Sequence, residues 1–252
     1  MIPSASNGLP FPAADETLDR WGPGRLQILQ KKNGYRFAID TMILADFIRL
    51  KLADRVLDLG TGCGILPLLL AAQIPRGRLI GLEVQPGLLD LAARNLRLNH
   101  RQGLIHLVRG DMRTVPALFR EACLDAVITN PPYRALKTGR VNPNEEKALA
   151  RHEILVDLPQ ILQGVRRILK DKGHFFLIYP ARRLAGLIFE ARRSRLEPKR
   201  LRLVHSFPES DGEWVLLEAV KYGGEELTIL PPLTVYEGPG VYSPEVRRIL
   251  ER

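Results

Sequence analysis

The chain has 252 residues, of which 45% are apolar and 26% are charged, a composition that suits one folded domain with small additions. Its 37 basic and 28 acidic side chains give a net charge of +9, which favours a polyanionic partner, although some basic enzymes have none. The two cysteines, Cys63 and Cys123, and five scattered histidines lack the spacing of a disulfide framework or a metal site.

The N-terminal residues 1–14 are rich in Pro, Ala and Ser, and we expect a flexible leader there. They lack the basic start and apolar core of a signal peptide, and no later window reaches the length of a membrane span. Residues 26–38 predict a short hairpin around the turn pair Asn33-Gly34. Asp40 can cap the helix that follows, and the hairpin and helix together predict a lid on the main domain.

A glycine-rich turn follows the predicted strand at 55–59. Gly60, Gly62 and Gly64 allow positive φ and let a ligand approach the backbone, and the N-terminus of the helix after them favours an anion such as a carboxylate. The spacing G-x-G-x-G differs from the dinucleotide fingerprint G-x-G-x-x-G, and no G-K-[ST] follows as in a P-loop. The turn is therefore a candidate ligand-binding loop of another kind.

Acidic residues stand where the next two predicted strands end. Glu83 follows the strand at 79–82, about twenty residues after the glycine turn, where an acid can bind both hydroxyls of a ribose. Asp111 follows the strand at 105–108, where it can accept from an adenine amine; either acid could instead be an ordinary solvated carboxylate. Ligands of open α/β sheets bind at the carboxyl ends of strands, so these acids and Asp58 predict one shared site with the glycine turn.

The predicted strand at 124–129 ends in Asn130-Pro131-Pro132-Tyr133, where we expect the chemistry to take place. The prolines remove two backbone donors, so this loop offers carbonyl oxygens, and Asn130 adds an amide oxygen. Together they can accept both hydrogens of a planar –NH2 group and localise its lone pair toward an electrophile. Tyr133 adds a flat face for a ring. The pattern fits an adenine, cytosine or guanine amine or a glutamine amide as the group that is bound. The alternative is that these residues only form a rigid turn after the strand.

A long polar loop at 134–156 follows, with Arg134 and Lys137 near its start, and we expect it to order around a substrate. The remaining predicted elements are a helix from Asp157 to Gly173, a strand at 174–179, a helix from 184, strands at 201–204 and 215–220, and a short helix at 244–250. Basic residues cluster between 182 and 202 and form either a solvated face or a phosphate-contacting patch. The candidates for phosphate contact are Arg192, Arg193, Lys199 and Arg200.

The strand with its glycine turn, the ribose acid and Asn-Pro-Pro-Tyr together resemble class I S-adenosylmethionine-dependent methyltransferases that modify exocyclic amines, over residues 40–220. Further short sequence segments resemble those of the bacterial family of valine-tRNA adenine-N6 methyltransferases, which methylates the adenine beside the anticodon. These segments are Glu16-Thr17-Leu18-Asp19, Phe37-Ala38-Ile39-Asp40, Arg151-His152-Glu153-Ile154, Leu196-Glu197-Pro198-Lys199-Arg200 and Ile229-Leu230-Pro231-Pro232-Leu233. The chain departs from members that carry Thr-Asp-Gly where it has Ile39-Asp40-Thr41.

The resemblance implies a Rossmann-like α/β fold, with a mostly parallel seven-stranded sheet, helices on both faces and an antiparallel last strand. The expected organisation is a leader at 1–14, a hairpin and helix lid at 15–50, a methyltransferase domain at 51–222 and a wrapping C-terminal tail at 223–252. We expect a cytoplasmic monomer that acts on tRNA and needs neither a metal nor a membrane.

The resemblance also implies direct in-line transfer of a methyl group from S-adenosylmethionine to N6 of an unstacked adenine. The expected cofactor-binding residues are Asp40, Asp58, Gly60, Gly62, Gly64, Glu83, Asp111 and Asn130. The expected catalytic residues are Asn130, Pro131, Pro132 and Tyr133. The expected RNA-binding residues are Tyr133, Arg134, Lys137, Arg192, Arg193, Lys199 and Arg200.

Two alternatives remain open. One is glutamine N5 methylation of a protein release factor, whose enzymes share Asn-Pro-Pro-Tyr but usually carry a helical N-terminal domain that residues 1–50 are too short to supply. The other is a non-catalytic RNA-binding module with this fold, against which the intact glycine turn and Asn-Pro-Pro-Tyr argue.

Overall fold

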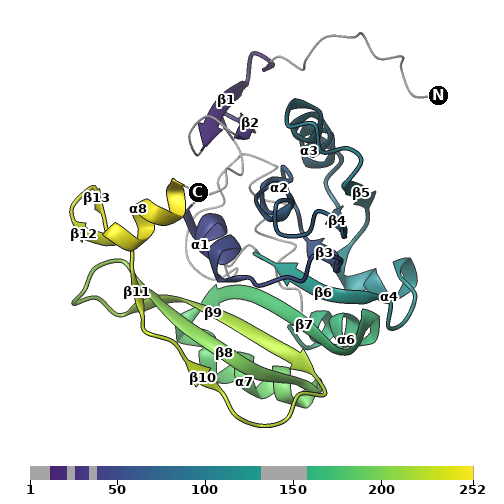
Figure 1. Ribbon diagram of the computed structural model, residues 1–252, viewed down its shortest axis with the longest axis vertical. Helices are drawn as coiled ribbons and strands as arrows, with labels where there is room; N and C mark the ends of the chain where they lie inside the picture. Colours follow the sequence, from purple (N-terminus) through teal and green to yellow (C-terminus); the bar gives the residue numbers. More distant parts are fainter. Residues whose placement is uncertain (1–11, 22–25, 34–38, 132–157, 252) are drawn as a thin grey trace, which may run out of the picture.

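The computed structural model describes residues 12–21, 26–33, 39–131 and 158–251, and its centre is a nine-stranded mixed sheet (Figure 1). The strand order is β10-β8-β9-β7-β6-β3-β4-β5, and β11 also pairs with β8. The seven long strands are β3 (Arg55–Leu59), β4 (Arg78–Glu83), β5 (Ile105–Arg109), β6 (Leu124–Thr129), β7 (Leu169–Pro180), β8 (Leu196–His205) and β9 (Gly212–Lys221). The two short strands are β10 (Thr228–Ile229) and β11 (Leu233–Thr234).

Strands β3, β4, β5, β6 and β7 are parallel to one another, whereas β9 is antiparallel to both β7 and β8. The predicted mostly parallel sheet with an antiparallel last long strand is therefore confirmed. The strand number differs from the prediction because the two-residue strands β10 and β11 join the exposed edge of β8. Such short pairings leave no recognisable pattern in the sequence.

Helices cover both faces of the sheet (Figure 1). One face carries α1 (Ile39–Phe47), α2 (Ile65–Leu70), α3 (Pro86–Leu98) and α8 (Pro244–Leu250), and the other carries α4 (Val115–Leu118), α6 (Leu158–Ile168) and α7 (Leu184–Arg193). Strand β7 shows why both faces need cover. Phe176 and Ile178 belong to the first hydrophobic core, and Phe175 and Leu177 belong to the second. Side chains alternate across a strand, so a continuous apolar run requires helices on both sides.

The first half of the hairpin predicted at 26–38 is a strand, and the pairing of its second half stays a prediction. Strand β2 (Leu26–Lys31) pairs antiparallel with β1 (Glu16–Trp21), which precedes it, and residues 34–38 lie outside the described residues. Asn33-Gly34 signals a turn but does not identify the strand that pairs with β2. Strand β1 supplies that partner because Leu18 and Trp21 pack on the same core as Ile28.

Two helix boundaries also differ from the predictions. Helix α6 ends at Ile168, and the following residues up to Gly173 already belong to β7, at an irregularity in its pairing with β6. Helix α1 begins at Ile39, so Asp40 lies in its first turn, where Oδ1 accepts a hydrogen bond from the Thr41 backbone N–H at 2.7 Å. The predicted cap Asp157 lies outside the described residues.

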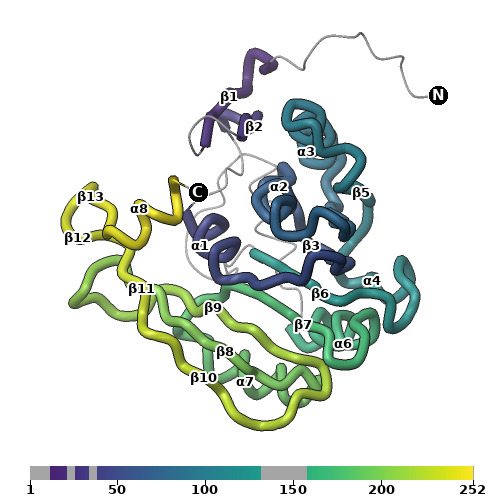
Figure 2. Tube along the Cα trace, viewed as in Figure 1, coloured from purple at the N-terminus to yellow at the C-terminus, as the bar shows by residue number. Residues whose placement is uncertain are grey.

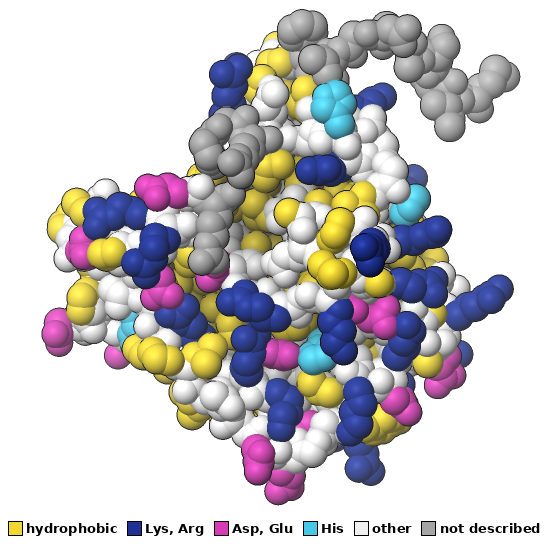
Figure 3. All heavy atoms as spheres, in the orientation of Figure 1, with side chains coloured by type: hydrophobic (Ala, Val, Ile, Leu, Met, Phe, Trp, Pro, Cys, Tyr) yellow, Lys and Arg dark blue, Asp and Glu magenta, His cyan; other side chains and the backbone are white. Residues whose placement is uncertain are grey.

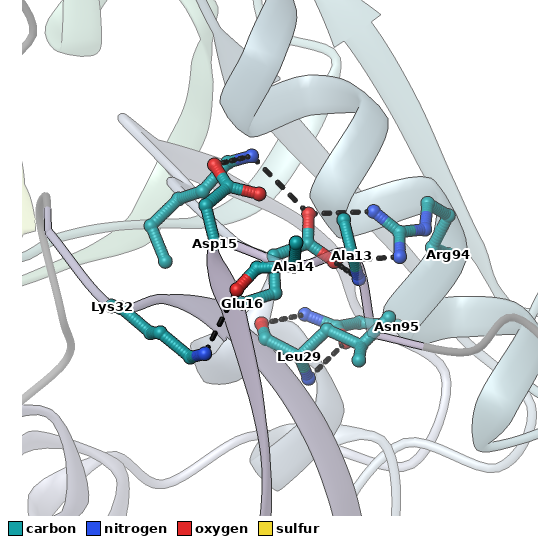
Figure 4. A network of polar contacts seen from close by, with 9 residues as sticks. Ala13, Ala14, Asp15, Glu16, Leu29, Lys32, Arg94 and Asn95 are labelled. Atoms are coloured by element: carbon teal, nitrogen blue, oxygen red, sulfur yellow. Dashed lines mark hydrogen bonds and ion pairs between the residues drawn. The ribbon is translucent and has the colours of Figure 1, made fainter.

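The hairpin is attached to α3 by side chains that replace a neighbouring strand. Asn95 is 0% exposed; its Oδ1 accepts from the Leu29 N–H at 2.7 Å, and its Nδ2 donates to the Leu29 carbonyl at 3.1 Å (Figure 4). Asn95 Nδ2 also donates to the Cys63 carbonyl at 2.9 Å. Asn99, one helical turn later, pairs with the N–H and carbonyl of Gln27 in the same way. Asn95 thereby links the hairpin to the glycine turn that contains Cys63.

An ion pair supports the same attachment. The Glu16 carboxylate accepts from both terminal nitrogens of Arg94 on α3 at 2.8 and 2.7 Å, and Lys31 lies 3.3 Å away (Figure 4). The hydrogen bonds from Arg94, followed by contributions from the Ala13 N–H and Lys31, lower the pKa of Glu16 to about 2 against the opposing effect of burial. Glu16 therefore stays ionised at neutral pH.

The C-terminal segment runs along β8 and then returns to α1 (Figure 2). After β10 and β11 come the small hairpin of β12 (Tyr236–Gly238) and β13 (Val241–Tyr242), and then α8. Val246 and Ile249 of α8 share one hydrophobic core with Ile43 of α1 and Val56 of β3. Within the described ranges, no helix is long and apolar enough to cross a membrane.

Replacing Asn95 by Ala should destabilise the protein by about 2–4 kcal/mol, because it leaves the Leu29 N–H and two carbonyls buried without partners. Asn99→Ala is the matched control and should cost about 1 kcal/mol, since its partly exposed partners can bind water. Urea unfolding of the purified variants measures both values. Equal losses for the two variants would show that Asn95 has no special role in attaching the hairpin.

Candidate functional site

The carboxyl ends of four parallel strands bring the predicted site residues to one edge of the sheet. In the register, Leu59 of β3 lies beside both Leu82 of β4 and Thr129 of β6, and Glu83 lies beside Arg109 of β5. The residues that follow these strand ends therefore meet at this edge. They are Gly60 after β3, Asp111 after β5, and Asn130 and Pro131 after β6.

The glycine turn after β3 uses backbone conformations that favour glycine. Gly60, Gly62 and Gly64 have φ angles of 76°, 55° and 81°, in the left-handed region where a Cβ causes strain. The N–H groups of Gly60 and Thr61 both donate to the Leu82 carbonyl at 2.9 Å, which fixes the turn against β4. A Cβ on Gly64 would also lie 3.2 Å from the Ala92 Cβ of α3. The turn can therefore lie close to both β4 and α3.

The Glu83 carboxylate is held by backbone donors from two segments. Its Oε2 accepts from the Gly62 N–H at 2.9 Å, and its Oε1 accepts from the N–H groups of Val84 and Gln85 at 3.0 Å each. The residue is 5% exposed. These bonds fix the carboxylate in one orientation and connect the end of β4 to the glycine turn. A ligand hydroxyl would meet an acceptor that needs little rearrangement.

Asp58 adds a second carboxyl group beneath this edge. It is 2% exposed, and its Oδ2 has no hydrogen-bond partner among the described residues. Burial and, to a smaller extent, the nearby Glu83 carboxylate raise the pKa of Asp58 to about 7. A buried acceptor without a partner is costly unless a ligand completes it. Two neighbouring carboxyl groups favour a ligand with a positive charge.

Asp111 has a partner from its own loop. It caps the short helix η1 (Met112–Thr114) by accepting from the Arg113 N–H at 2.8 Å, and it also pairs with the Arg113 guanidinium. The Arg113 side chain holds the pKa of Asp111 below its usual range. The structure thus places Asp111 at the predicted edge, but as an ionised carboxylate already paired with an arginine.

Asn130 is contacted by a residue that the sequence did not single out. Its side-chain Nδ2 donates to Thr41 Oγ1 of α1 at 3.0 Å. Pro131 is buried directly after it, and the Thr129 hydroxyl ties β6 to the Leu59 carbonyl at 2.9 Å. Asp40, the other predicted residue of α1, precedes Thr41. No motif identifies Thr41, because its role depends on a contact across 89 positions. The predicted residues Pro132, Tyr133, Arg134 and Lys137 lie outside the described residues.

The predicted basic patch starts at the opposite edge of the sheet. Across the sheet, Glu197 near the start of β8 is level with Val220 of β9, His174 of β7 and Ala126 near the start of β6. Since β8 runs parallel to β7 across the antiparallel β9, its first residues lie at the amino ends of the parallel strands. The register therefore separates Arg192 and Arg193, which precede β8, from the glycine turn. Lys199 and Arg200 lie further along β8. Arg200 is level with Ile128, the second-last residue of β6, but β9 and β7 separate it from that strand.

These four basic side chains also have partners within the chain. Arg192 pairs with Glu197 and Glu225, and Arg193 pairs with Glu190. Lys199 donates to two carbonyls, those of Gly224 and Glu225. Arg200 pairs with Glu218, donates to the Phe47 carbonyl and lies over the Phe47 ring. In the view of Figure 3, acidic side chains lie among the Lys and Arg side chains.

Among the described residues, no group of three or more His, Cys, Asp or Glu lies close enough together to hold a metal ion.

Comparisons with known proteins agree on one class of protein. Residues 35–181 match the family model of the methyltransferase small domain. A tRNA1(Val) (adenine(37)-N6)-methyltransferase from Porphyromonas gingivalis is 28% identical over 199 residues, which cover 77% of each chain.

Two solved structures show the fold. A predicted O-methyltransferase, Atu636 from Agrobacterium tumefaciens, superposes with a TM-score of 0.66 at 23% identity, over 83% of this chain and 94% of that chain. The geranyl diphosphate C-methyltransferase of Streptomyces coelicolor, solved with S-adenosyl-L-homocysteine, superposes with a TM-score of 0.53 at 16% identity, over 72% of this chain and 78% of that chain. The chain therefore has the fold of class I methyltransferases.

Replacing Asp58 by Asn should raise the free energy of unfolding at pH 8 by roughly 1–3 kcal/mol, because it removes a buried charge at constant volume. The pKa of Asp58 rises from 3.8 to about 7 on folding, so the folded state binds more protons between these values. The wild type should therefore gain stability relative to Asp58→Asn as the pH falls from 7 toward 4. Chemical unfolding at several pH values measures the difference, and a difference that does not vary with pH would contradict this prediction.

Proposed function

Because the chain belongs to the methyltransferase small domain family, we propose that it transfers a methyl group from S-adenosylmethionine to the exocyclic N6 of an adenine in tRNA. The observation that carries the proposal is the convergence of the glycine turn, the fixed Glu83 carboxylate and the Asn130 amide at one sheet edge. Relatives named for methylation of adenine 37 in tRNA1(Val) support the same substrate, the adenine beside the anticodon of a valine tRNA.

The residues at this edge fit S-adenosylmethionine. The three positive-φ glycines let a ligand lie against the backbone, and Glu83 is a fixed acceptor suited to the two ribose hydroxyls. Asp58 Oδ2 is a buried acceptor without a partner among the described residues, which suits the ammonium group of the methionine part. We also propose that Asp111 lies near the adenine of the cofactor and that Asp40 and Asn130 complete its site. When bound, the cofactor supplies an electrophilic methyl group on a sulfonium.

The chain's own contribution to the chemistry lies in its acceptors. We propose that Asn130 Oδ1 and the Pro131 carbonyl accept the two hydrogens of the adenine amine and thereby localise the nitrogen lone pair. No strong base is needed before attack, because the amine proton becomes acidic only as the new bond forms. The proposal assigns Pro132 and Tyr133, outside the described residues, to holding and stacking the base.

An adenine in an anticodon loop is a suitable target, because unstacking costs less energy in a loop than in a duplex. For contacts to the surrounding RNA backbone, the proposal favours Arg134 and Lys137, which follow the Asn-Pro-Pro-Tyr motif directly. Arg192, Arg193, Lys199 and Arg200 are less suited, since they pair within the chain and lie on or just before β8, which β9 and β7 separate from β6.

The proposed organisation keeps residues 15–50 as a lid and residues 223–252 as a tail around the domain at 51–222. We further propose a monomer that acts in the cytoplasm, the compartment of its tRNA substrate.

Calorimetry should show binding of S-adenosylmethionine or its demethylated product. Glu83→Ala should weaken this binding by about 1–3 kcal/mol, since a ribose hydroxyl would lose its charged acceptor. Glu225→Ala is the control, because that glutamate is exposed and pairs with Arg192 away from the site, and it should bind the cofactor like the wild type. Binding of NAD without any binding of S-adenosylmethionine would refute the cofactor assignment.

Transfer of a labelled methyl group tests the reaction itself. The wild type should label tRNA at N6 of an adenine and should leave a protein release factor unlabelled. Asn130→Ala should reduce turnover by about 100-fold, as for loss of a preorganised electrostatic group, and this loss should far exceed any loss of cofactor affinity. Labelling of the release factor alone would favour glutamine methylation, and turnover of Asn130→Ala within twofold of wild type would make Asn130 a simple turn residue.

A further inference from the structure

We infer that Thr41 is a positioning residue for the methyl transfer, because its hydroxyl fixes which end of the Asn130 amide faces the substrate amine. The inference rests on the proposed function, in which Asn130 Oδ1 accepts a hydrogen from that amine. Helix α1 would then orient the Asn130 amide, in addition to packing in the hydrophobic core. The functional element would therefore extend beyond the four residues at the end of β6.

Thr41 is placed to do this by the fold. It is 3% exposed in the first turn of α1, and its Oγ1 lies 3.0 Å from Asn130 Nδ2. The same hydroxyl lies 3.4 Å from Asp40 Oδ1, which also accepts from the Thr41 backbone N–H at 2.7 Å. The three side chains thus form a chain of hydrogen bonds from Asp40 through Thr41 to Asn130.

The available hydrogens determine which group donates and which accepts in this series of hydrogen bonds. A threonine hydroxyl has one hydrogen and two acceptor positions, whereas a carboxylate oxygen only accepts. The Thr41 hydrogen therefore goes to Asp40, and the Thr41 oxygen is left to accept. The group that Asn130 presents to Thr41 must then be its NH2 and not its carbonyl oxygen.

This direction matters because an amide has two orientations of nearly equal shape, and only its hydrogen bonds distinguish them. With Nδ2 held by Thr41, Oδ1 occupies the other branch of the amide and points away from Thr41. The reversed orientation would present N–H groups to the hydrogens of the substrate amine and would repel them. One hydrogen bond in α1 therefore determines whether the end of β6 offers an acceptor or a donor.

Two substitutions separate hydrogen bonding from packing. Thr41→Val keeps the shape and the β-branch of the side chain but removes the hydroxyl, and Thr41→Ser keeps the hydroxyl but removes the methyl group. Thr41→Val should lower kcat for methyl transfer to a tRNA transcript about tenfold, the effect of one lost hydrogen bond. The KM for tRNA and the Kd for S-adenosylhomocysteine should stay within twofold. Thr41→Ser should retain kcat within about threefold of wild type.

A double-mutant cycle assigns the effect to Asn130. In an Asn130→Ala background, Thr41→Val should cause no further loss of kcat, because the amide that it orients is absent. A kcat of Thr41→Val within twofold of wild type would overturn the inference. It would also be overturned by an equal further loss in the Asn130→Ala background, or by a Thr41→Ser variant as impaired as Thr41→Val.

A measurement without substrate keeps this inference distinct from the proposed function. The side-chain NH2 signals of Asn130 in a ¹⁵N-labelled sample are identified by their loss in Asn130→Ala. Thr41→Val should shift them and speed their hydrogen exchange, whereas Thr41→Ser should not. Failure to methylate tRNA would refute the proposed function while these signals still showed the hydrogen bond. Signals that Thr41→Val leaves unchanged would refute the role of Thr41 even if tRNA were methylated.

Discussion

The hydrogen bonds of the Glu83 carboxylate hold the functional edge of the sheet together. They connect the Gly62 N–H in the turn after β3 with the N–H groups of Val84 and Gln85 after β4. A carboxylate with several backbone donors is stable in its ionised form even when buried. Because the glycine turn also donates to the Leu82 carbonyl, the two strand ends cannot move independently. The other parts of the site are arranged around this fixed pair.

Asp58 illustrates that a functional arrangement can be unfavourable for the folded protein alone. Its buried Oδ2 lacks a partner among the described residues, and burial raises its pKa to about 7. Such a group lowers stability near neutral pH, but it is ready to accept from a positively charged ligand. The neighbouring Glu83 adds to the same preference. The proposed cofactor would supply the charge that both carboxyl groups favour.

Elements outside the central strands complete the site through polar contacts. Asn95 of α3 ties the hairpin strand β2 to the carbonyl of Cys63, so the hairpin is joined to the glycine turn of the proposed cofactor site. Thr41 of α1 contacts Asn130 at the end of β6. Helix α8, near the C-terminal end of the described chain, packs against α1 in the same hydrophobic core.

The sequence alone determined the features that depend on neighbouring residues. Local sequence patterns predicted the long strands and a helix from residue 184, where α7 begins, and the glycines at 60, 62 and 64 predicted the turn whose positive φ angles they adopt. Only the tertiary structure decided which segments meet. It paired β2 with β1, placed the start of β8 at the amino ends of the parallel strands so that Arg192 lies away from the site, and brought Thr41 to Asn130. The physical reason is that local conformation is set by adjacent side chains, whereas strand pairing, strand direction and long-range hydrogen bonds depend on how the whole chain packs.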